Sequence, residues 1–341
     1  MSDTINRTDT TSTTDITTTT DPTATIDDSS LFDLESIRDG EYSEEEWTVL
    51  KIFAHGIQPA MPGVAAEAAH QFDILCPPLE QVHEANHYLY TLWNVMITIA
   101  RSPDVTSDIH VQLVGILQIL RQTSKGELDV YGAKRRVWRD SPQLSYAMDA
   151  FFSDPMQNVA TSVELTPREA LIWRNLNSFA ARCLGADVAG PYSDAMYAMR
   201  SALEEDLSTI ETNMIRCKVQ VACDWILHAA KPFLWWAREN IDYYVTPDDQ
   251  EGQYIEGGAL YHGPPAMCLQ RWAFWQGRFE EIGKEDSILD EETKNITLET
   301  ARLMKTIESS MAPTFLQYRP DNRSWQSRNP QPVVQKMYQD I

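Results

Sequence analysis

The sequence predicts an all-α protein, a single irregular bundle of about ten helices with a disordered N-terminal tail. Apolar residues recur at helical spacing along most of the chain, and several segments open on strong helix-start signals. We find no sustained apolar/polar alternation that would indicate strands, and no repeat period that would indicate a solenoid. With 43% hydrophobic and 10% aromatic residues, a chain of 341 residues can bury a large core.

Composition divides the chain into three parts. Residues 1–42 are expected to form a disordered, acidic, Ser/Thr-rich tail, because Thr, Ser and Asp make up 22 of the first thirty residues. Residues 43–311 carry the helical pattern and are expected to form one helical domain. Residues 312–341 are rich in Pro, Asn, Gln and Arg, which indicates a weakly structured C-terminal tail.

Capping and proline signals define the elements expected in the first half of the domain. Ser43 and Glu46 form a capping box, so the first helix should begin there. Pro62 suits the first turn of a second helix, and Pro77-Pro78 separates that helix from a third. A loop around Gly132 is expected before a short helix. The helices expected after the first one span about residues 62–75, 79–101, 106–122 and 142–153.

The second half of the domain contains the clearest helix start. Thr166-Pro167-Arg168-Glu169 combines an N-cap, a proline at the first helical position and a reciprocal glutamate, and Gly185 should end that helix. Pro232 should kink or break a later helix. Residues 246–265 concentrate proline and glycine and are the best candidate for a surface loop or lid. The helices expected here span about residues 167–184, 194–206, 210–230, 233–240, 266–284 and 290–310.

The net charge of −22 restricts the classes of partner. Residues 1–46 hold 13 acidic and 2 basic residues, and the rest of the chain is acidic as well. A negative field repels phosphate backbones and anionic lipids, so we expect neither nucleic acid nor membrane as a partner. The most apolar stretch, residues 88–100, is too short and too polar to span a bilayer, and no secretory signal is visible.

The cysteines indicate the compartment. Five widely spaced cysteines are an odd number, and most lie within helical apolar patterns, which is typical of reduced, buried thiols. Such thiols predict a cytoplasmic protein, with the nucleus as a second possible compartment. We expect no cofactor, and the expected partner is an unidentified protein or small molecule.

Four segments carry a resemblance to a known family. The two most specific are Asn175-Leu176-Asn177-Ser178-Phe179-Ala180-Ala181-Arg182, preceded by Trp173-Arg174, and Arg271-Trp272-Ala273-Phe274-Trp275, followed by Arg278-Phe279. The others are Arg136-Val137-Trp138-Arg139-Asp140-Ser141-Pro142 with Tyr131-Gly132, and Ala222-Cys223-Asp224-Trp225-Ile226, with Gly258-Ala259-Leu260-Tyr261-His262-Gly263 accompanying the arginine-tryptophan segment. Over about residues 45–285 the chain thereby resembles a fungal family, domain of unknown function 3632. The resemblance implies a fungal source and a helical domain, and no catalytic residue, because the family has no assigned chemistry.

A zinc-binding pattern is present on the predicted third helix. His83-Glu84-Ala85-Asn86-His87 fits the template in which two histidines one helical turn apart bind zinc and the glutamate is the base. No third ligand is identifiable downstream, so a zinc hydrolase using His83, Glu84 and His87 is the weakest functional hypothesis. We expect instead that both histidines hydrogen-bond to neighbouring helices.

Asp224 and His228 are the candidate catalytic residues. They are four positions apart on one predicted helix, so the carboxylate could orient the imidazole for general acid or base catalysis. A purely structural Asp–His pair is the plainer interpretation, because no serine or cysteine nucleophile is identifiable nearby.

Four residues are candidates for ligand binding. Arg271, Trp275 and Arg278 project from one side of their predicted helix and could hold an anionic ligand, although ion pairs between helices are the more ordinary use of such arginines. Asn177 lies on the apolar face of its helix, where a buried amide either locks helix packing or points into a ligand cavity.

These observations favour a noncatalytic intracellular helical protein that binds a partner or a small ligand, because no intact catalytic constellation can be assembled. The alternative is a fungal small-molecule enzyme of specialised metabolism with an aromatic pocket between helices. Whether the protein is an enzyme is left open by the sequence.

Overall fold

The structure, a computed structural model, describes residue 37 and residues 40–58, 63–156, 165–239, 255–285 and 289–311. The tail predicted for residues 1–42 lies almost wholly outside the described residues, and the tail predicted for residues 312–341 lies entirely outside them. The described part contains ten helices and one small sheet, which confirms the all-α prediction. The helices are α2 (Glu44–Gly56), α3 (Val64–Leu75), α4 (Val82–Ala100), α5 (Ser107–Gln122), α6 (Leu144–Asp149), α7 (Pro167–Gly185), α8 (Tyr192–Leu203), α9 (Thr212–Glu239), α10 (Leu269–Lys284) and α11 (Glu291–Ser310).

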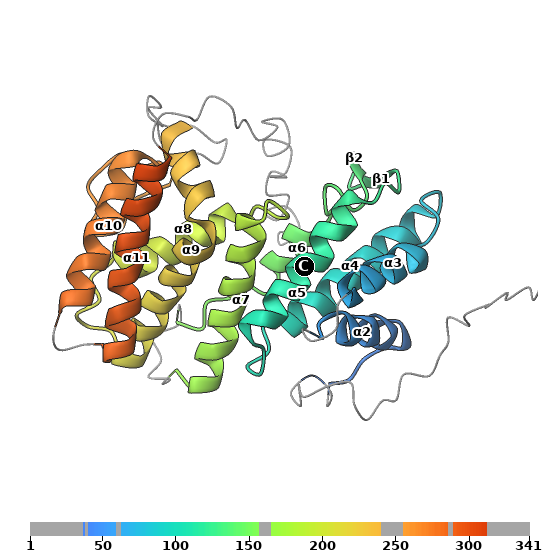
Figure 1. Ribbon diagram of the computed structural model, residues 1–341, viewed down its shortest axis with the longest axis horizontal. Coiled ribbons are helices and arrows are strands. Elements are labelled where there is room, and N and C mark those ends of the chain that lie inside the picture. The colour runs from blue at the N-terminus through green and yellow to red at the C-terminus, as the bar shows by residue number, and fades with distance from the viewer. Residues whose placement is uncertain are drawn as a thin grey trace, which may run out of the picture.

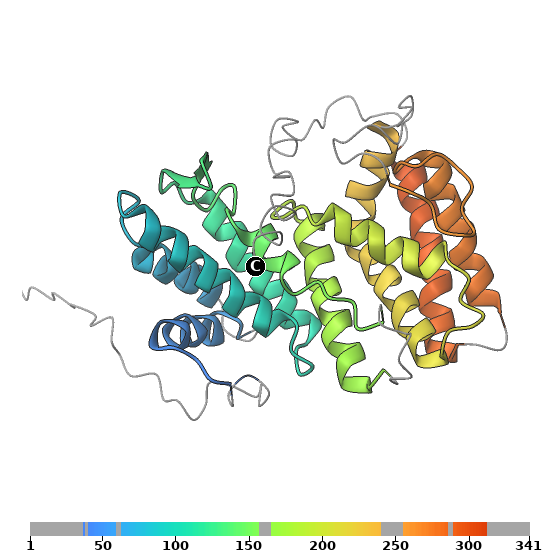
Figure 2. The same ribbon diagram turned by 180° about the vertical axis from the view of Figure 1, so that it is seen from behind.

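The helices form an elongated bundle in which α7 joins two groups (Figure 1). Helices α2–α5 lie at one end and α8–α11 at the other, and the view from behind shows the same division (Figure 2). Helix α7 packs most extensively against α9 on one side and also contacts α4 and α5 on the other. Buried apolar residues from both groups belong to one continuous cluster, so the described helices share a single core. None of these helices is long and apolar enough to cross a membrane.

Both predicted capping boxes are present. At α2, the backbone N–H of Glu46 donates to Ser43 Oγ (3.2 Å), and the Ser43 N–H donates back to the Glu46 carboxylate (2.8 Å). Thr166 and Glu169 make the same exchange at α7, where Pro167 occupies the first helical position. The side chains thereby satisfy backbone donors that have no partner within the helix, which is why these starts are readable from sequence.

The predicted interruption at Pro232 is a kink within α9. Pro232 has no N–H, so the carbonyl of His228, four residues earlier, loses its helical partner. The backbone of Ala229 departs from helical geometry, with φ −127° and ψ 17°. Gly185, at the end of α7, packs against this kink, and a Cβ there would lie 2.0 Å from the His228 carbonyl oxygen. Only glycine permits this approach of the two backbones.

A β-hairpin replaces the loop that the sequence predicts around Gly132. Strand β1 (Glu127–Val130) pairs antiparallel with β2 (Ala133–Arg136) and packs on α4. The connecting residues, Tyr131 and Gly132, both have positive φ, 52° and 82°. Two such residues in succession form the tight turn that suits a hairpin, but tyrosine is an unusual residue for it. The prediction of a loop is therefore wrong for residues 127–136, because four-residue strands with an atypical turn give almost no periodic signal.

Candidate functional site

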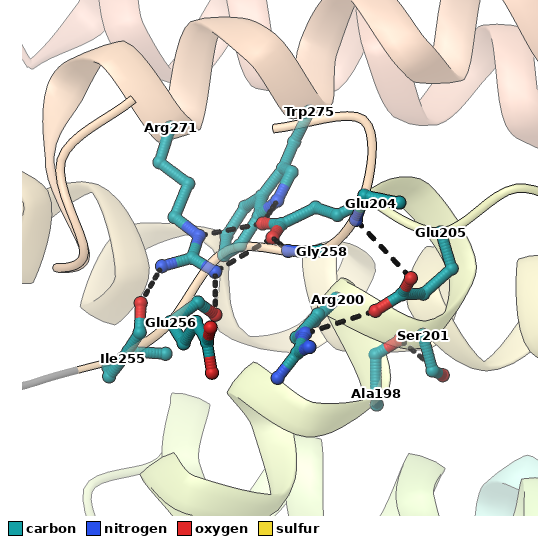
Figure 3. A network of polar contacts seen from close by, with 11 residues as sticks. Ala198, Arg200, Ser201, Glu204, Glu205, Ile255, Glu256, Gly258, Arg271 and Trp275 are labelled. Atoms are coloured by element: carbon teal, nitrogen blue, oxygen red, sulfur yellow. Dashed lines mark hydrogen bonds and ion pairs between the residues drawn. The ribbon is translucent and has the colours of Figure 1, made fainter. Parts of the chain in front are cut away.

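Glu204 and Arg271 form a fully buried ion pair between the end of α8 and the first turn of α10 (Figure 3). Arg271 Nε donates to Glu204 Oε1 at 2.6 Å, and Nη2 donates to Oε2 at 2.7 Å. The indole N–H of Trp275 donates to the same Oε1 at 2.6 Å. The structure thus brings two of the predicted ligand-binding residues together with a glutamate that the sequence did not indicate. Glu204 was missed because it belongs to an acidic run, Glu204-Glu205-Asp206, that is typical of solvated surface.

Residues 255–258, at the start of the described part of the predicted lid, lie against this ion pair (Figure 3). The remaining Arg271 hydrogen bonds are to backbone carbonyls, those of Ile255 (2.7 Å) and Glu256 (3.1 Å). Gly258 N–H donates to the Glu204 carboxylate at 3.0 Å, and a Cβ on this glycine would lie 2.6 Å from the Glu204 carbonyl oxygen. This stretch is therefore anchored to α8 and α10 by a buried charge pair, and residues 246–254 of the predicted lid lie outside the described residues.

These contacts give Arg271 and Trp275 a structural role. Each of the three guanidinium nitrogens of Arg271 already donates to a protein oxygen, and the side chain is 0% exposed. Removing one partner from such a pair leaves an uncompensated buried charge, which costs about 3–5 kcal/mol. Arg278 stands apart, because its Nε donates to the Leu203 carbonyl (3.1 Å) and its Nη1 to Glu281 (2.6 Å).

Asn177 joins α7 to α9 through one buried hydrogen bond and makes a second within α7. Its side-chain oxygen accepts from Trp225 Nε1 at 2.9 Å, and its amide donates to the Trp173 carbonyl at 2.9 Å. Both side chains are fully buried. The amide is thus engaged on both sides, and it fixes the rotation of α9 against α7.

The predicted partnership of Asp224 and His228 is replaced by an ion pair with a third residue. Arg174 of α7 donates to the two Asp224 oxygens at 2.9 and 3.4 Å. Burial raises the pKa of Asp224, and the charge of Arg174 opposes that rise. Burial lowers the pKa of His228 to about 4, helped by the positive charges of Arg182 and His110. His228 is therefore neutral at physiological pH, and the carboxylate at 224 is held by an arginine.

The zinc-template residues lie on the exposed side of α4. His83 and Glu84 are exposed, and His87 is also exposed with its Nε2 3.3 Å from Glu45 on α2. No group of three or more His, Cys, Asp or Glu side chains in the described ranges is placed to hold a metal ion. Among the described residues, no third zinc ligand therefore lies near His83 and His87.

A cavity of about 270 Å³ opens between the segment that follows α6, helix α7 and the start of α8. We call it the α7–α8 cavity. Two of its aromatic rings, Phe152 and Trp173, meet edge to face with centroids 5.8 Å apart. A third ring, Tyr197, donates its hydroxyl to Asp154 at 2.9 Å. The lining residues are Phe152, Asp154, Trp173, Ser193, Asp194 and Tyr197.

The ionisable residues that line the α7–α8 cavity are both acidic. Asp154 is 5% exposed and Asp194 is half-buried, and neither forms an ion pair with a described lysine or arginine. Burial, with the nearby Asp149 charge, raises the pKa of Asp194 to about 7, although its own backbone N–H partly offsets the rise. A raised carboxyl pKa in an aromatic cavity is a feature of functional sites.

Sequence reasoning missed this cavity apart from Trp173, which is the first residue of one of the segments that carry the family resemblance. Asp194 was interpreted only as the start of a helix, and Asp154 precedes a proline in what looked like a plain loop. No spacing rule connects residues 152–154 with residues 193–197, because only the packing of α7 and α8 brings them together.

A second hollow, of about 190 Å³, lies between α2, the end of α3 and α4. Its lining is mainly apolar and includes Val49, Leu75, Pro77 and Tyr88, with Glu45 and Thr48 at its polar side. Ile74, Leu75 and Val82 are exposed in the same region.

A protein-family model matches residues 93–279, more than half of the chain, under the description "protein of unknown function (DUF3632)". The chain belongs to this family. All residues that line the α7–α8 cavity fall within the matched range, whereas those that line the second hollow lie outside it. No curated protein and no solved structure is significantly similar to the chain. The match concerns the domain, so the fungal source implied by the resemblance stays an expectation.

Proposed function

We propose that this DUF3632 protein is a noncatalytic binding protein whose ligand site is the α7–α8 cavity. One observation carries the proposal: three aromatic rings and two carboxylates that have no described cationic partner converge on a cavity of about 270 Å³. Ligand sites in helical proteins are typically clefts between helices with mainly aromatic walls and a few polar groups. The cavity also lies within the part of the chain that defines the family.

The contacts of the sequence candidates support a binding role over a catalytic one. Arg271, Trp275 and Asn177 direct their polar atoms at other protein groups, and Asp224 is paired with Arg174. A catalytic group needs its reactive atom open to a substrate. These four side chains instead hold α7, α8, α9 and α10 together, so they position the cavity without lining it.

The proposed setting is the cytoplasm or the nucleus, with a small molecule or a protein side chain as the partner. All five cysteines are free and buried, which suits a reducing compartment. The net charge of −22 argues against nucleic acid and anionic membranes as partners.

A small-molecule enzyme is the second candidate, and the acidity of one residue favours it. The Asp194 carboxyl, with a pKa of about 7, could donate or accept a proton near neutral pH beside an aromatic-walled cavity. This candidate requires turnover of a substrate that Asp194→Asn abolishes while ligand binding persists.

The binding proposal is tested by filling the cavity. Ser193 is exposed at the cavity wall, so Ser193→Trp should occupy the cavity without removing a core side chain. Ser309→Trp, at an exposed position of α11, is the matched control. We expect at least one fragment from a mixed panel of cationic, neutral and anionic fragments, screened by ligand-observed NMR, to bind the parent and the control but not Ser193→Trp. Equal binding to all three proteins would overturn the proposal.

A further inference from the structure

We infer that the α7–α8 cavity binds an organic ammonium group, carried either by a free amine or by a lysine side chain of a partner. The inference rests on the proposed function, because it names the ligand class of the same site. Three features of the cavity point to a cation: its three aromatic rings, the fixed position of one carboxylate, and the absence of a described basic residue from its lining.

The aromatic walls favour a positive ligand. The faces of aromatic rings carry negative electrostatic potential, and quaternary ammonium groups bind in cages of two or more such rings. Phe152 and Trp173 meet edge to face, with their planes at 79°, and both rings line the cavity. Tyr197 provides a third ring from α8. A neutral apolar ligand would gain contact area here, but it would gain nothing from the ring potentials.

The carboxylates make the preference for a cation stronger. Asp154 is almost fully buried, and it is held in place by the Tyr197 hydroxyl (2.9 Å) and by the Met156 N–H (2.8 Å). Hydrogen bonds of this kind orient a carboxylate without neutralising its charge. Asp194 adds a second acidic group on the opposite element, and no described arginine or lysine lines the cavity. An anionic ligand would enter a cavity lined by two acidic residues and no described basic one, whereas an ammonium group would find acidic oxygens there to pair with.

The acidity of Asp194 is consistent with a cation-binding site. Its pKa is raised to about 7, so this carboxyl is partly protonated at neutral pH. A bound ammonium group would favour the carboxylate and release that proton. Asp149 is the charged neighbour that raises this pKa further, and Asp154 is the other acid of the lining.

The test uses three probes of one shape and different charge: tetramethylammonium, tert-butanol and pivalate. Their affinities for the parent protein are measured by NMR titration at pH 8, where Asp194 is largely ionised. We expect tetramethylammonium to bind at least about tenfold more tightly than tert-butanol, because a desolvated cation–π contact and two carboxylates act on the charge alone. Pivalate should not bind.

Variants show which groups carry the preference. Asp194→Asn should weaken tetramethylammonium binding by about tenfold and leave tert-butanol binding unchanged. Asp108→Asn, in the first turn of α5, is the matched control and should change neither. Tyr197→Leu should weaken tetramethylammonium binding more than Tyr197→Phe, which keeps the ring.

The outcomes separate this inference from the proposed function. Equal binding of tetramethylammonium and tert-butanol, both blocked by Ser193→Trp, would overturn the cation inference and leave the cavity as a binding site. If no probe or fragment binds in a Ser193-dependent way, both proposals fail. A peptide with an embedded trimethyllysine that binds more tightly than tetramethylammonium identifies a partner's side chain as the source, and weaker binding identifies a free amine.

Discussion

The acidic side chains at the two ends of α8 differ in whether a described basic residue pairs with them. At the C-terminal end, Glu204 is fully buried and accepts hydrogen bonds from Arg271, Trp275 and Gly258. At the N-terminal end, Asp194 is half-buried beside aromatic rings, and no described lysine or arginine pairs with it. The first carboxylate has all the partners that a buried charge requires, and the second does not.

The difference indicates that Glu204 stabilises the fold, whereas Asp194 is available to a ligand. A buried charge with complete partners contributes to one rigid arrangement and offers a ligand little. A carboxyl group that has been desolvated without a counter-charge destabilises the folded state, and a cationic ligand can recover that cost. The predictions below test the two ends of α8 in order of expected effect.

The largest effect is expected from breaking the ion pair. Arg271→Met leaves Glu204 buried without its cation and should lower the free energy of unfolding by about 3–5 kcal/mol, measured by urea denaturation. Arg278→Met, on the same helix but partly exposed, should lower it by about 1 kcal/mol or less. The double variant Glu204→Met/Arg271→Met should recover part of the loss. An Arg271→Met protein as stable as the parent would contradict the structural role of this pair.

A close backbone contact at the same end should give the next largest effect. Gly258→Ala places a Cβ 2.6 Å from the Glu204 carbonyl oxygen, so the segment must move away from α8. We expect a loss of about 1–3 kcal/mol of stability in thermal or urea unfolding. Gly277→Ala on α10 is the control, because a Cβ there meets no atom within 4 Å, and alanine should stabilise that helix by about 0.5–1 kcal/mol.

The parent protein and the Asp194→Asn variant should differ in how their stability depends on pH. The folded-state pKa of Asp194, about 7, lies above its unfolded value, so its contribution to stability is greatest below about pH 4 and is lost as the pH rises through 7. Asparagine does not titrate. Because solvent screens this half-buried group, the pKa difference is discounted, and Asp194→Asn should gain about 1–2 kcal/mol relative to the parent between pH 4 and pH 8, in urea denaturation at both pH values. Parallel stability curves for parent and variant would show that Asp194 is not desolvated.

The smallest effect is expected at the hydrogen bond that orients Asp154. Tyr197→Phe removes the hydroxyl that donates to this buried carboxylate and should cost about 1 kcal/mol in thermal unfolding. Tyr146→Phe is the comparison, since Tyr146 is a tyrosine on α6 that is 50% exposed, and its change should be close to zero. Equal effects of the two substitutions would mean that the Tyr197 hydroxyl does not hold Asp154.

Features that depend on neighbouring residues in the sequence could be predicted without the structure. The starts of α2 and α7 follow from capping side chains that hydrogen-bond to backbone N–H groups within three residues. The kink of α9 follows from Pro232, which leaves the carbonyl four residues earlier without a helical hydrogen bond. The hairpin was not predicted, because Tyr131 gives no turn signal at a position with positive φ. Among candidate site residues, the sequence identified side chains that are buried and polar, such as Arg271 and Asn177, but not their partners.

Partners and cavities depend on contacts between distant residues. Arg271 lies 67 positions from Glu204, and Asp224 lies 50 positions from Arg174. The α7–α8 cavity joins residues 152–154 to residues 193–197 across a helix. Helical periodicity says that a residue faces the core, but it does not say which residue of another helix it meets there. The sequence alone thus predicted an acidic helical protein of this family with approximate helix positions, whereas several helix ends, such as those of α6 and α8, differ from the prediction. Helix packing decided which charges are paired and which one lines a cavity without a described counter-charge.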